Sequence, residues 1–401
     1  MTGVEAVVVG AGQAGLAVSH GLTQRGVAHV VLERGRIGET WRRRWDSFCL
    51  VTPNWSVQLP GYPYDGDDPD GFMPRDEIVA YLERYAASFG APVREGVRVE
   101  SVDKQGNAFV IETSAGQYQT ASLVLATGAF QRPHRPPGAY TLPERLLRID
   151  VDDYANPERL PEGGVLVVGS GQSGCQIAEE LHQAGREVVV ACGRAPWSPR
   201  RIGGRDLFWW AIESGFMDTS ADSLPREARL AANILASGHE GGHDLHYRTL
   251  RALGVTLTGR FLGAARGRAQ FAPDLARSVA WGDERYQQLR ELFSSFAMRQ
   301  GLDTYGLDDP EPFDPVMPEE IDLTRFGTVL FAGGFRPGYA AWLPWSDAFD
   351  ADGFPLQKDG ISTVVGGLHF VGLHFLRKRK SALLIGVGED AAIVAAAVVG
   401  R

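Results

Sequence analysis

The chain has 401 residues, among them 49 glycines, and 40 lysines and arginines against 49 aspartates and glutamates give it a net charge of −9. A hydrophobic content of 44% excludes intrinsic disorder, and the acidic balance argues against a nucleic-acid partner because contact with phosphates needs a basic surface. Three separated cysteines without a Cys-x-x-Cys pair exclude a redox-active dithiol, and with no apolar run of ~18 residues and no basic leader we expect a cytoplasmic protein without a membrane partner.

The first predicted unit has the order strand, glycine-rich turn, helix and strand, over residues 6–9, 10–15, 16–24 and 29–32. In a dinucleotide-binding unit of this kind, Gly10 forms the tight turn, Gly12 lets the backbone approach a pyrophosphate, and Gly15 lets helix and strand pack closely. The helix N-terminus offers N–H groups to the phosphates. Glu33, at the end of the second strand, can accept hydrogen bonds from ribose hydroxyls.

The same order occurs a second time, over residues 165–168, 169–174, 175–182 and 187–191. The position that corresponds to Glu33 is Cys192, and four arginines follow it: Arg194, Arg200, Arg201 and Arg205. Loss of the acid removes repulsion against a 2′-phosphate, and a guanidinium group can bind such a phosphate through two hydrogen bonds. We therefore predict NADPH at the second unit and FAD at the first; a solvated basic patch is the alternative interpretation of the arginines.

Further elements are predicted outside the two units. They are a helix at 81–87, strands at 97–102, 109–113 and 123–125, helices at 227–235 and 283–298, an extended piece at 255–258, a strand at 328–332 and a final helix within 381–399. The proline-rich segment 131–138 is expected to connect two domains, since proline blocks both helix and sheet ladders.

The predicted fold is α/β, with two Rossmann-like dinucleotide-binding domains. We expect a discontinuous FAD domain of residues 1–150 and 325–401, because the strand at 328–332 and the final helix lack a partner unless they return to the first sheet. The NADPH domain is expected at 160–324, with a helical insert at about 205–300.

Several stretches together resemble the class B flavin monooxygenases, which include flavin-containing monooxygenases, the YUCCA enzymes and compact bacterial relatives. They are residues 10–15, 38–41, 50–55, 126–128, 169–174, 203–206 and 332–337. The resemblance covers essentially the whole chain. It implies FAD contacts at Gly10, Gly12, Gln13, Ala14, Gly15, Glu33, Arg34, Gly38, Thr40, Trp41, Val99, Ala126, Thr127, Gly128, Gly334 and Leu384. It implies NADPH contacts at Gly169, Gly171, Gln172, Ser173, Gly174, Arg194, Arg200 and Arg201.

The resemblance also implies a catalytic role for Asn54, beside the flavin and NADP+. By this resemblance NADPH reduces the flavin, O2 adds at flavin C4a, and the resulting (hydro)peroxide transfers one oxygen atom to a small organic substrate. From the residues alone, Asn54 is equally a turn residue, and Trp41 is either a core residue or a flavin neighbour. A homodimer is possible.

One departure from the family favours an alternative function. Asp150 stands in residues 147–154 where related sequences usually carry a histidine. An NADPH-dependent flavin reductase or dehydrogenase without oxygen transfer is therefore the alternative. A flavin-binding sensor without turnover and a metal-dependent hydrolase at His239 and His243 are more distant alternatives.

Three further motifs have competing interpretations. His239-Glu240-Gly241-Gly242-His243 spells the His-Glu-x-x-His motif of zinc hydrolases, but two interior glycines cost a helix roughly 1 kcal/mol each, so a loop is expected and no metal is assigned. The aromatic cluster at 206–210 is either core or the lining of a substrate pocket. The cationic run at 377–380 is a solvated loop, a nucleic-acid or membrane contact, or an anion site next to a flavin.

Overall fold

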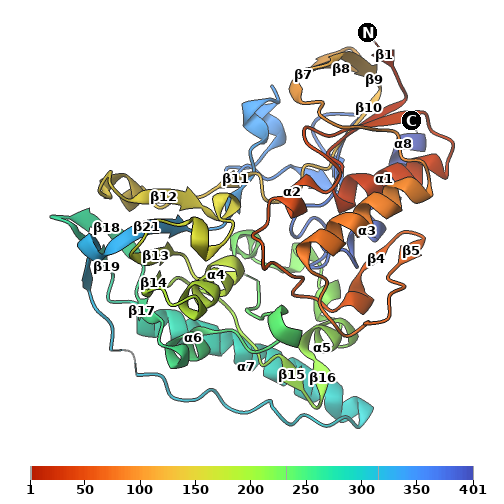
Figure 1. The fold of residues 1–401 in the computed structure, drawn as a ribbon. Helices are drawn as coiled ribbons and strands as arrows, with labels where there is room; N and C mark the ends of the chain where they lie inside the picture. Colours follow the sequence, from red (N-terminus) through yellow and green to blue (C-terminus); the bar gives the residue numbers. More distant parts are fainter. Residues whose placement is uncertain (1, 232, 315, 401) are drawn as a thin grey trace.

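The computed structural model describes residues 2–231, 233–314 and 316–400, which form two α/β units side by side (Figure 1). The helices are α1 (Gln13–Thr23), α2 (Glu39–Arg42), α3 (Arg75–Ser88), α4 (Gln172–Gln183), α5 (Leu207–Glu213), α6 (Tyr247–Leu253), α7 (Leu275–Gln300) and α8 (Val387–Val399). Short two-stranded pairs are β4 (Gln58–Leu59) with β5 (Tyr62–Pro63), and β15 (Arg201–Ile202) with β16 (Arg205–Asp206).

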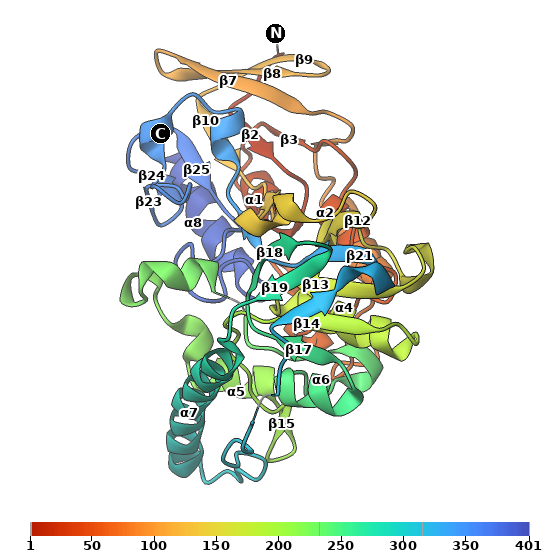
Figure 2. The same cartoon turned by 90° about the vertical axis from the view of Figure 1, so that its left-hand side faces the viewer.

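A seven-stranded sheet forms the centre of the first unit. Its strands, in spatial order, are β23 (Gln357–Lys358), β24 (Ile361–Ser362), β25 (Leu368–Phe370), β10 (Ser122–Leu125), β2 (Ala6–Val9), β3 (His29–Leu32) and β6 (Val93–Arg94). Ala6 and Val8 pack with α1 and α8, while Val7 and Val9 pack with the opposite layer. That layer is the sheet β1 (Thr2–Gly3), β9 (Gly116–Thr120), β8 (Ala108–Thr113) and β7 (Val99–Gln105), uppermost in Figure 2.

The second unit repeats this arrangement around a parallel sheet. Its strands, in order, are β12 (Leu147–Asp150), β21 (Phe326–Phe331), β13 (Gly164–Val168), β14 (Val188–Ala191) and β17 (Thr256–Thr258). Val165 and Val167 pack with α4 and α7, while Leu166 and Val168 face the sheet β18 (Phe261–Ala265), β19 (Arg268–Phe271) and β20 (Glu320–Asp322). The continuous apolar runs of these strands therefore follow from burial on both faces.

The strand pairing corrects the predicted domain boundaries. The strand expected to return to the first sheet is β21, and it lies between β12 and β13 of the second sheet. A parallel strand buried on both faces has the same apolar run in either sheet, so the sequence could not choose. The two units meet where β11 (Arg132–Pro133) pairs with β22 (Phe335–Arg336). Residues 147–150 and 326–331 thus belong to the second unit.

The final helix does return to the first unit as expected. Gly21 of α1 faces α8, and an added Cβ there would lie 3.0 Å from the Cβ of Ala395. Ala391, Val394 and Ala395 are buried with α1 in one core.

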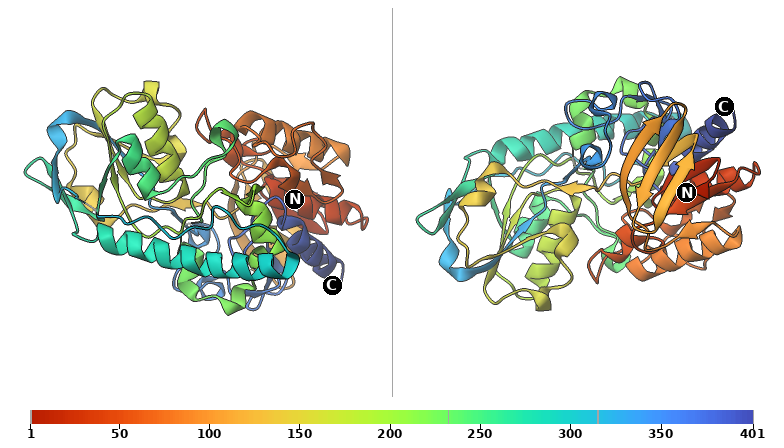
Figure 3. Two further views of the ribbon diagram at one scale, coloured as in Figure 1. Left: turned by 90° about the horizontal axis from the view of Figure 1, so that it is seen from below. Right: turned by 90° about the horizontal axis from the view of Figure 1, so that it is seen from above.

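The insert is less helical than predicted. The expected helix at 283–298 is part of α7, the long helix along one side of the molecule in Figure 3. The expected helix at 227–235 is not formed: Arg226–Leu230 make only a 3-10 turn, and the Leu235 N–H donates to the Pro196 carbonyl instead of to a helical partner. Ala232 lies outside the described residues. The insert also contains β17 of the second sheet and the β18–β19 hairpin.

Candidate functional site

A cavity of about 1740 Å³ lies between the two units and is lined by residues of both. It lies at the carboxyl ends of the central parallel strands, where α/β sheets place their ligands. A typical small-molecule site occupies roughly 300–1,000 Å³. The cavity therefore has room for more than one ligand.

The three glycines of the first turn differ in what surrounds them. Gly10 has φ +105°, and an added Cβ would lie 2.6 Å from the Ala126 carbonyl oxygen. At Gly15 an added Cβ would lie 1.8 Å from the Gly10 oxygen, whereas at Gly12 it would meet nothing within 4 Å. Gly12 also lines the cavity. Gly10 therefore supplies the positive φ, Gly15 allows the close packing of helix and strand, and Gly12 leaves an open space at the cavity, called the cradle below.

Glu33 braces this turn from the end of β3. Its Oε2 accepts a hydrogen bond from the Ala11 N–H at 2.8 Å and its Oε1 accepts one from the Gly35 N–H at 2.9 Å. The carboxylate is 7% exposed and lines the cavity. Each carboxylate oxygen has further lone pairs, so Glu33 can still accept from a ligand hydroxyl.

The structure brings most of the predicted residues of the first unit together. Those that line the cavity are Gly10, Gly12, Gln13, Ala14, Glu33, Arg34, Gly38, Thr40, Trp41, Val99, Ala126, Thr127, Gly128 and Leu384. Trp41 donates from Nε1 to Gln13 Oε1 at 2.9 Å, which fixes its indole at the cavity wall. Gly15 lies behind the turn, and Gly334 lies at the crossing of the two units, where its carbonyl accepts from the His134 N–H at 2.9 Å.

The second turn repeats the first. Gly169 has φ +113°, and an added Cβ would lie 2.4 Å from the Ala332 oxygen; at Gly174 it would lie 2.2 Å from the Gly169 oxygen. Gln172 and Ser173 line the cavity, while Gly169, Gly171 and Gly174 form the turn behind them. Arg194 is exposed and lines the cavity, and no ion pair to another described residue holds its side chain.

The other two predicted arginines have partners within the chain. Arg200 is 2% exposed; its Nη1 donates to the Val51 carbonyl at 2.7 Å and its Nε lies 2.9 Å from Asp206 Oδ2. Arg201 Nη1 lies 3.0 Å from the same oxygen and does not line the cavity. Asp206 pairs with both arginines, and Arg200 lines the cavity even though its side chain is buried. Of the three, Arg201 lies outside the cavity and Arg194 is the exposed one that lines it, and the 2′-phosphate contact of Arg194 stays a prediction.

Asn54 has a structural environment that differs from the predicted catalytic one. It begins a 3-10 turn, is 4% exposed and does not line the cavity. Its Nδ2 donates to the Asp68 carbonyl at 2.9 Å, and its Oδ1 accepts from the Met73 N–H at 2.7 Å. Both ends of the amide therefore hold the loop, as in the turn-residue interpretation, and the catalytic placement is corrected.

Asp150 is also part of the framework. Arg135 donates to both of its carboxylate oxygens at 2.8 Å, and the same guanidinium lies 4.7 Å from the ring centre of Phe331. This pair ties the connecting segment to the edge strand β12. The position that carries a histidine in related sequences does not line the cavity, although Asp152 and Asp153 do.

The His-Glu-x-x-His segment lacks the helix that a zinc hydrolase requires. His239–Gly241 form a 3-10 turn in which Glu240 has φ 49°. His243 Nε2 lies 3.0 Å from Glu179 Oε1 on α4, and this contact raises the pKa of His243. Across the described ranges, no three metal-ligating side chains gather into one group. The metal-hydrolase alternative requires both histidines on one face of a helix, and the structure has a 3-10 turn there instead.

The aromatic cluster at 206–210 divides between its two interpretations. Trp210 is fully buried in the core of the second unit, whereas Phe208 lines the cavity.

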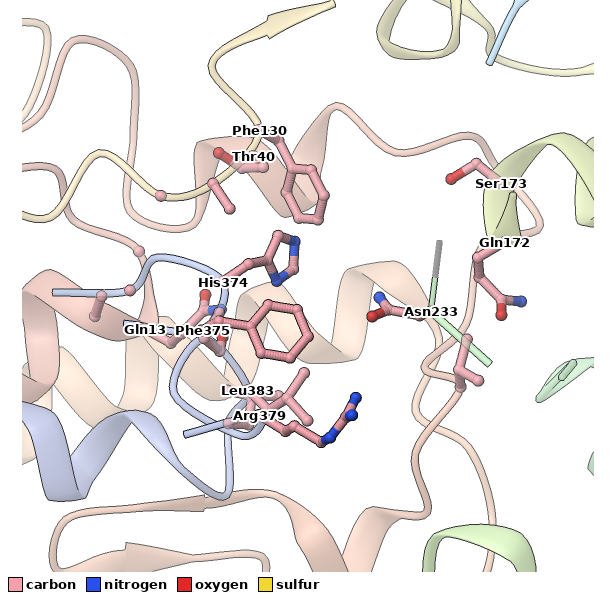
Figure 4. Close-up of a pocket in the computed structure, with 18 of the residues that line it drawn as sticks. Gln13, Thr40, Phe130, Gln172, Ser173, Asn233, His374, Phe375, Arg379 and Leu383 are labelled. Atoms are coloured by element: carbon pink, nitrogen blue, oxygen red, sulfur yellow. Dashed lines mark hydrogen bonds between the residues drawn. The ribbon is translucent and has the colours of Figure 1, made fainter. Parts of the chain in front are cut away.

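Sequence reasoning missed a group of cavity residues in the loop after β25. Figure 4 shows His374, Phe375 and Arg379 reaching into the cavity, between Gln13 on one side and Gln172 and Ser173 on the other. The His374 ring lies 5.2 Å from that of Phe130, and burial lowers its pKa to about 4. The signal for this group was the cationic run at 377–380, but the sequence does not show which of its side chains faces inward.

None of the helices in the described part of the chain combines the length and apolar character that a bilayer crossing requires. The family described as pyridine nucleotide-disulphide oxidoreductase matches residues 7–203. The uncharacterized oxidoreductase CzcO-like of Geobacillus kaustophilus is 31% identical over 390 residues, which cover 97% of this chain and 96% of that protein. The indole-3-pyruvate monooxygenase YUCCA1 of Oryza sativa is 35% identical over 215 residues, or 52% of each chain.

Among solved structures, the flavin-containing monooxygenase from Stenotrophomonas maltophilia has the same fold, with a TM-score of 0.69 and 21% identity over 100% of this chain and 99% of that one. The fold comparison and the sequence comparison with the CzcO-like oxidoreductase both extend over nearly the whole chain. The chain belongs to the family of CzcO-like oxidoreductases, and part of its sequence and its fold resemble flavin monooxygenases.

Proposed function

We propose that the protein is an FAD- and NADPH-dependent monooxygenase that transfers one atom of O2 to a small organic substrate. The observation that carries this proposal is that two glycine turns, each at the end of a buried parallel strand, face one cavity. The first has Glu33 beside it, which suits the ribose of FAD. The second has Arg194, which suits the 2′-phosphate of NADPH.

The residues of the first turn fit FAD. A Cβ at Gly12 would occupy the open cradle, so the absence of a side chain leaves room for a pyrophosphate above the N-terminus of α1. Thr40, Trp41 and Leu384 would line the flavin end of the site. When bound, FAD supplies the redox chemistry, which consists of accepting a hydride from NADPH and activating O2.

The side chains of the insert would exclude water from the reacting centre. Phe208, Phe216 and Leu292 line the cavity from the second unit. The segment that carries Phe216 is held to the loop after β25 (residues 371–386), called the C-terminal loop below. The Arg379 N–H donates to the Thr219 carbonyl at 3.2 Å, and the Ala221 N–H donates to the Arg377 carbonyl at 2.7 Å. A closed apolar site limits the loss of reactive oxygen species to water.

A flavin reductase remains the second candidate, because Asn54 and Asp150 are both engaged in structural contacts. The experiment that separates the two measures hydrogen peroxide and oxygenated product per NADPH consumed, in air, with a panel of organic substrates. A monooxygenase converts a substantial fraction of NADPH into oxygenated product with at least one of them. If every electron pair ends in peroxide or in a non-oxygen acceptor, the reductase is the function.

A further inference from the structure

The four cations of residues 377–380 differ in what they contact. Three of them have carboxylate partners: Arg377 with Asp359 and Asp390, and Lys378 and Lys380 each with Asp218 and Glu389, at 2.6 to 3.0 Å. Arg379 is the exception, since no carboxylate of a described residue pairs with it. The run as a whole is therefore a set of ion pairs around one guanidinium that has no carboxylate partner among the described residues.

This guanidinium lies in the cavity among aromatic rings. Its carbon is 4.2 Å from the ring centre of Phe216 and 5.6 Å from that of Phe375. Its Nε is buried without a hydrogen-bond partner among the residues that the structure describes. Figure 4 shows the side chain extending into the cavity beside Leu383. Burial lowers the pKa of Arg379, yet a guanidinium stays protonated in proteins.

An uncompensated charge in such surroundings is costly until a ligand anion neutralises it. The phosphates of the two proposed cofactors have their own sites, at the N-terminus of α1 for FAD and at the second glycine turn with Arg194 for NADPH. Arg379 belongs to neither turn. An anion that binds Arg379 would therefore belong to a third ligand. The substrate is the ligand that remains.

We propose that Arg379 binds the carboxylate of an organic-acid substrate whose apolar body packs against Phe216, Phe375 and Leu383. The planar fork of a guanidinium matches the two oxygens of a carboxylate, and the rings beside it suit a hydrocarbon or aryl group. This inference rests on the proposed function, since it names the substrate class of the same cavity.

Binding to the FAD-loaded protein tests the proposal without turnover. Phenylacetate, 3-phenylpropionate and octanoate are titrated against their neutral amides, with the perturbation of the flavin spectrum and the shift in melting temperature as readouts. We expect at least one acid to bind wild type about tenfold or more tightly than its amide, and Arg379→Gln to weaken that acid roughly 10- to 100-fold while leaving the amide unchanged. Arg325→Gln, which removes an exposed guanidinium outside the cavity, is the matched control and should bind the acid as wild type does.

Each opposite result overturns the proposal. It fails if no acid binds wild type below on the order of 10 mM, if acid and amide bind equally, or if Arg379→Gln binds the acid unchanged. A variant that loses NADPH affinity but keeps acid binding would assign the guanidinium to the cofactor instead. If the acid binds as expected but all NADPH ends in peroxide, the anion site stands and the monooxygenase function fails.

Discussion

Single residues in this protein are distinguished by what a side chain would meet. Gly12 and Gly15 belong to one motif, yet an added Cβ finds open space at the first and a carbonyl oxygen at 1.8 Å at the second. Arg194 and Arg201 belong to one basic stretch, yet the first lines the cavity and the second pairs with Asp206 outside it. Substitutions at these positions can therefore test ligand binding separately from folding.

Gly12→Val should fold and fail to retain FAD. Its φ of −82° is open to any residue and nothing lies within 4 Å of the added Cβ, but the larger side chain would fill the cradle. We expect less than about a tenth of the wild-type flavin absorbance near 450 nm at an unchanged circular dichroism spectrum. Gly193→Ala, another site with nothing within 4 Å, is the control and should stay yellow. A Gly12→Val protein with full flavin would show that the cradle does not hold the pyrophosphate.

Arg194→Ala should impair NADPH more than NADH. Loss of a hydrogen bond to a charged group costs about 1.5–3 kcal/mol, so the Michaelis constant for NADPH should rise roughly 10- to 100-fold. Steady-state kinetics with both cofactors measure this. Arg201→Ala is matched in charge, and because Arg201 pairs with Asp206 outside the cavity it should change neither constant. Equal losses with both cofactors in the Arg194 variant would remove the 2′-phosphate contact from the proposal.

At the scale of elements, the short helix α6 depends on one neutral histidine. His246 caps it: Nδ1 accepts from the Arg248 N–H at 3.2 Å, while the ring lies 4.6 Å from that of Trp197 and is 9% exposed. Burial lowers the pKa of His246 to about 4. An accepting Nδ1 must be unprotonated, so the cap and the burial favour the same charge state.

The free energy of unfolding should therefore decrease as the pH is lowered from 6.5 to 4. In the unfolded chain His246 has a pKa of ~6.5 and takes up a proton below that pH, whereas in the folded protein it stays neutral down to about pH 4. The neutral histidine therefore stabilises the fold fully above pH ~6.5, and this stabilisation is lost as the pH falls to about 4. Each such histidine contributes a slope of about 1.4 kcal/mol per pH unit in this window, and His374 adds its own. His246→Asn keeps an acceptor at the cap and removes the titration. Urea unfolding at pH 6.5, 5.5 and 4.5 should show a shallower slope for the variant; parallel curves would contradict the assignment.

For the molecule as a whole, the sequence predicted the units better than their boundaries. The glycine turns and the buried strands beside them depend on local chemistry, and β2, β3, β13 and β17 formed where they were expected. The placement of β21 depends on pairing between distant segments, which an apolar run does not encode. The same holds for the site: the turns were predicted, but Arg379 and His374 reach the cavity only because the C-terminal loop folds under the insert.

That contact between insert and C-terminal loop leads to a prediction about how the cavity is closed. Asp218 of the insert contacts both Lys378 and Lys380 of the C-terminal loop, beside the backbone bond from the Lys380 N–H to the Met217 carbonyl. Glu389 of α8 contacts the same two lysines, so it holds them in place for the ion pairs that join the two units. Partly exposed pairs contribute little individually, about 0–1 kcal/mol each. Removing both acids should therefore open this contact locally without unfolding the protein.

The double variant Asp218→Asn/Glu389→Gln tests this by hydrogen exchange. The amides of Ala221, Arg379 and Lys380 donate across the contact, so their exchange should accelerate roughly 5- to 10-fold, as a loss of about 1 kcal/mol of local stability implies. Amides within α7 should exchange as in wild type. Asp309→Asn removes an exposed acid that pairs with Arg290 elsewhere, and it should leave all three amides unchanged. In the FAD-loaded enzyme the same opening should raise the peroxide formed per NADPH, because water gains access to the cavity. Unchanged exchange at the three amides would mean that the apolar contacts of Phe216 and Met217, rather than the ion pairs, hold the two units closed.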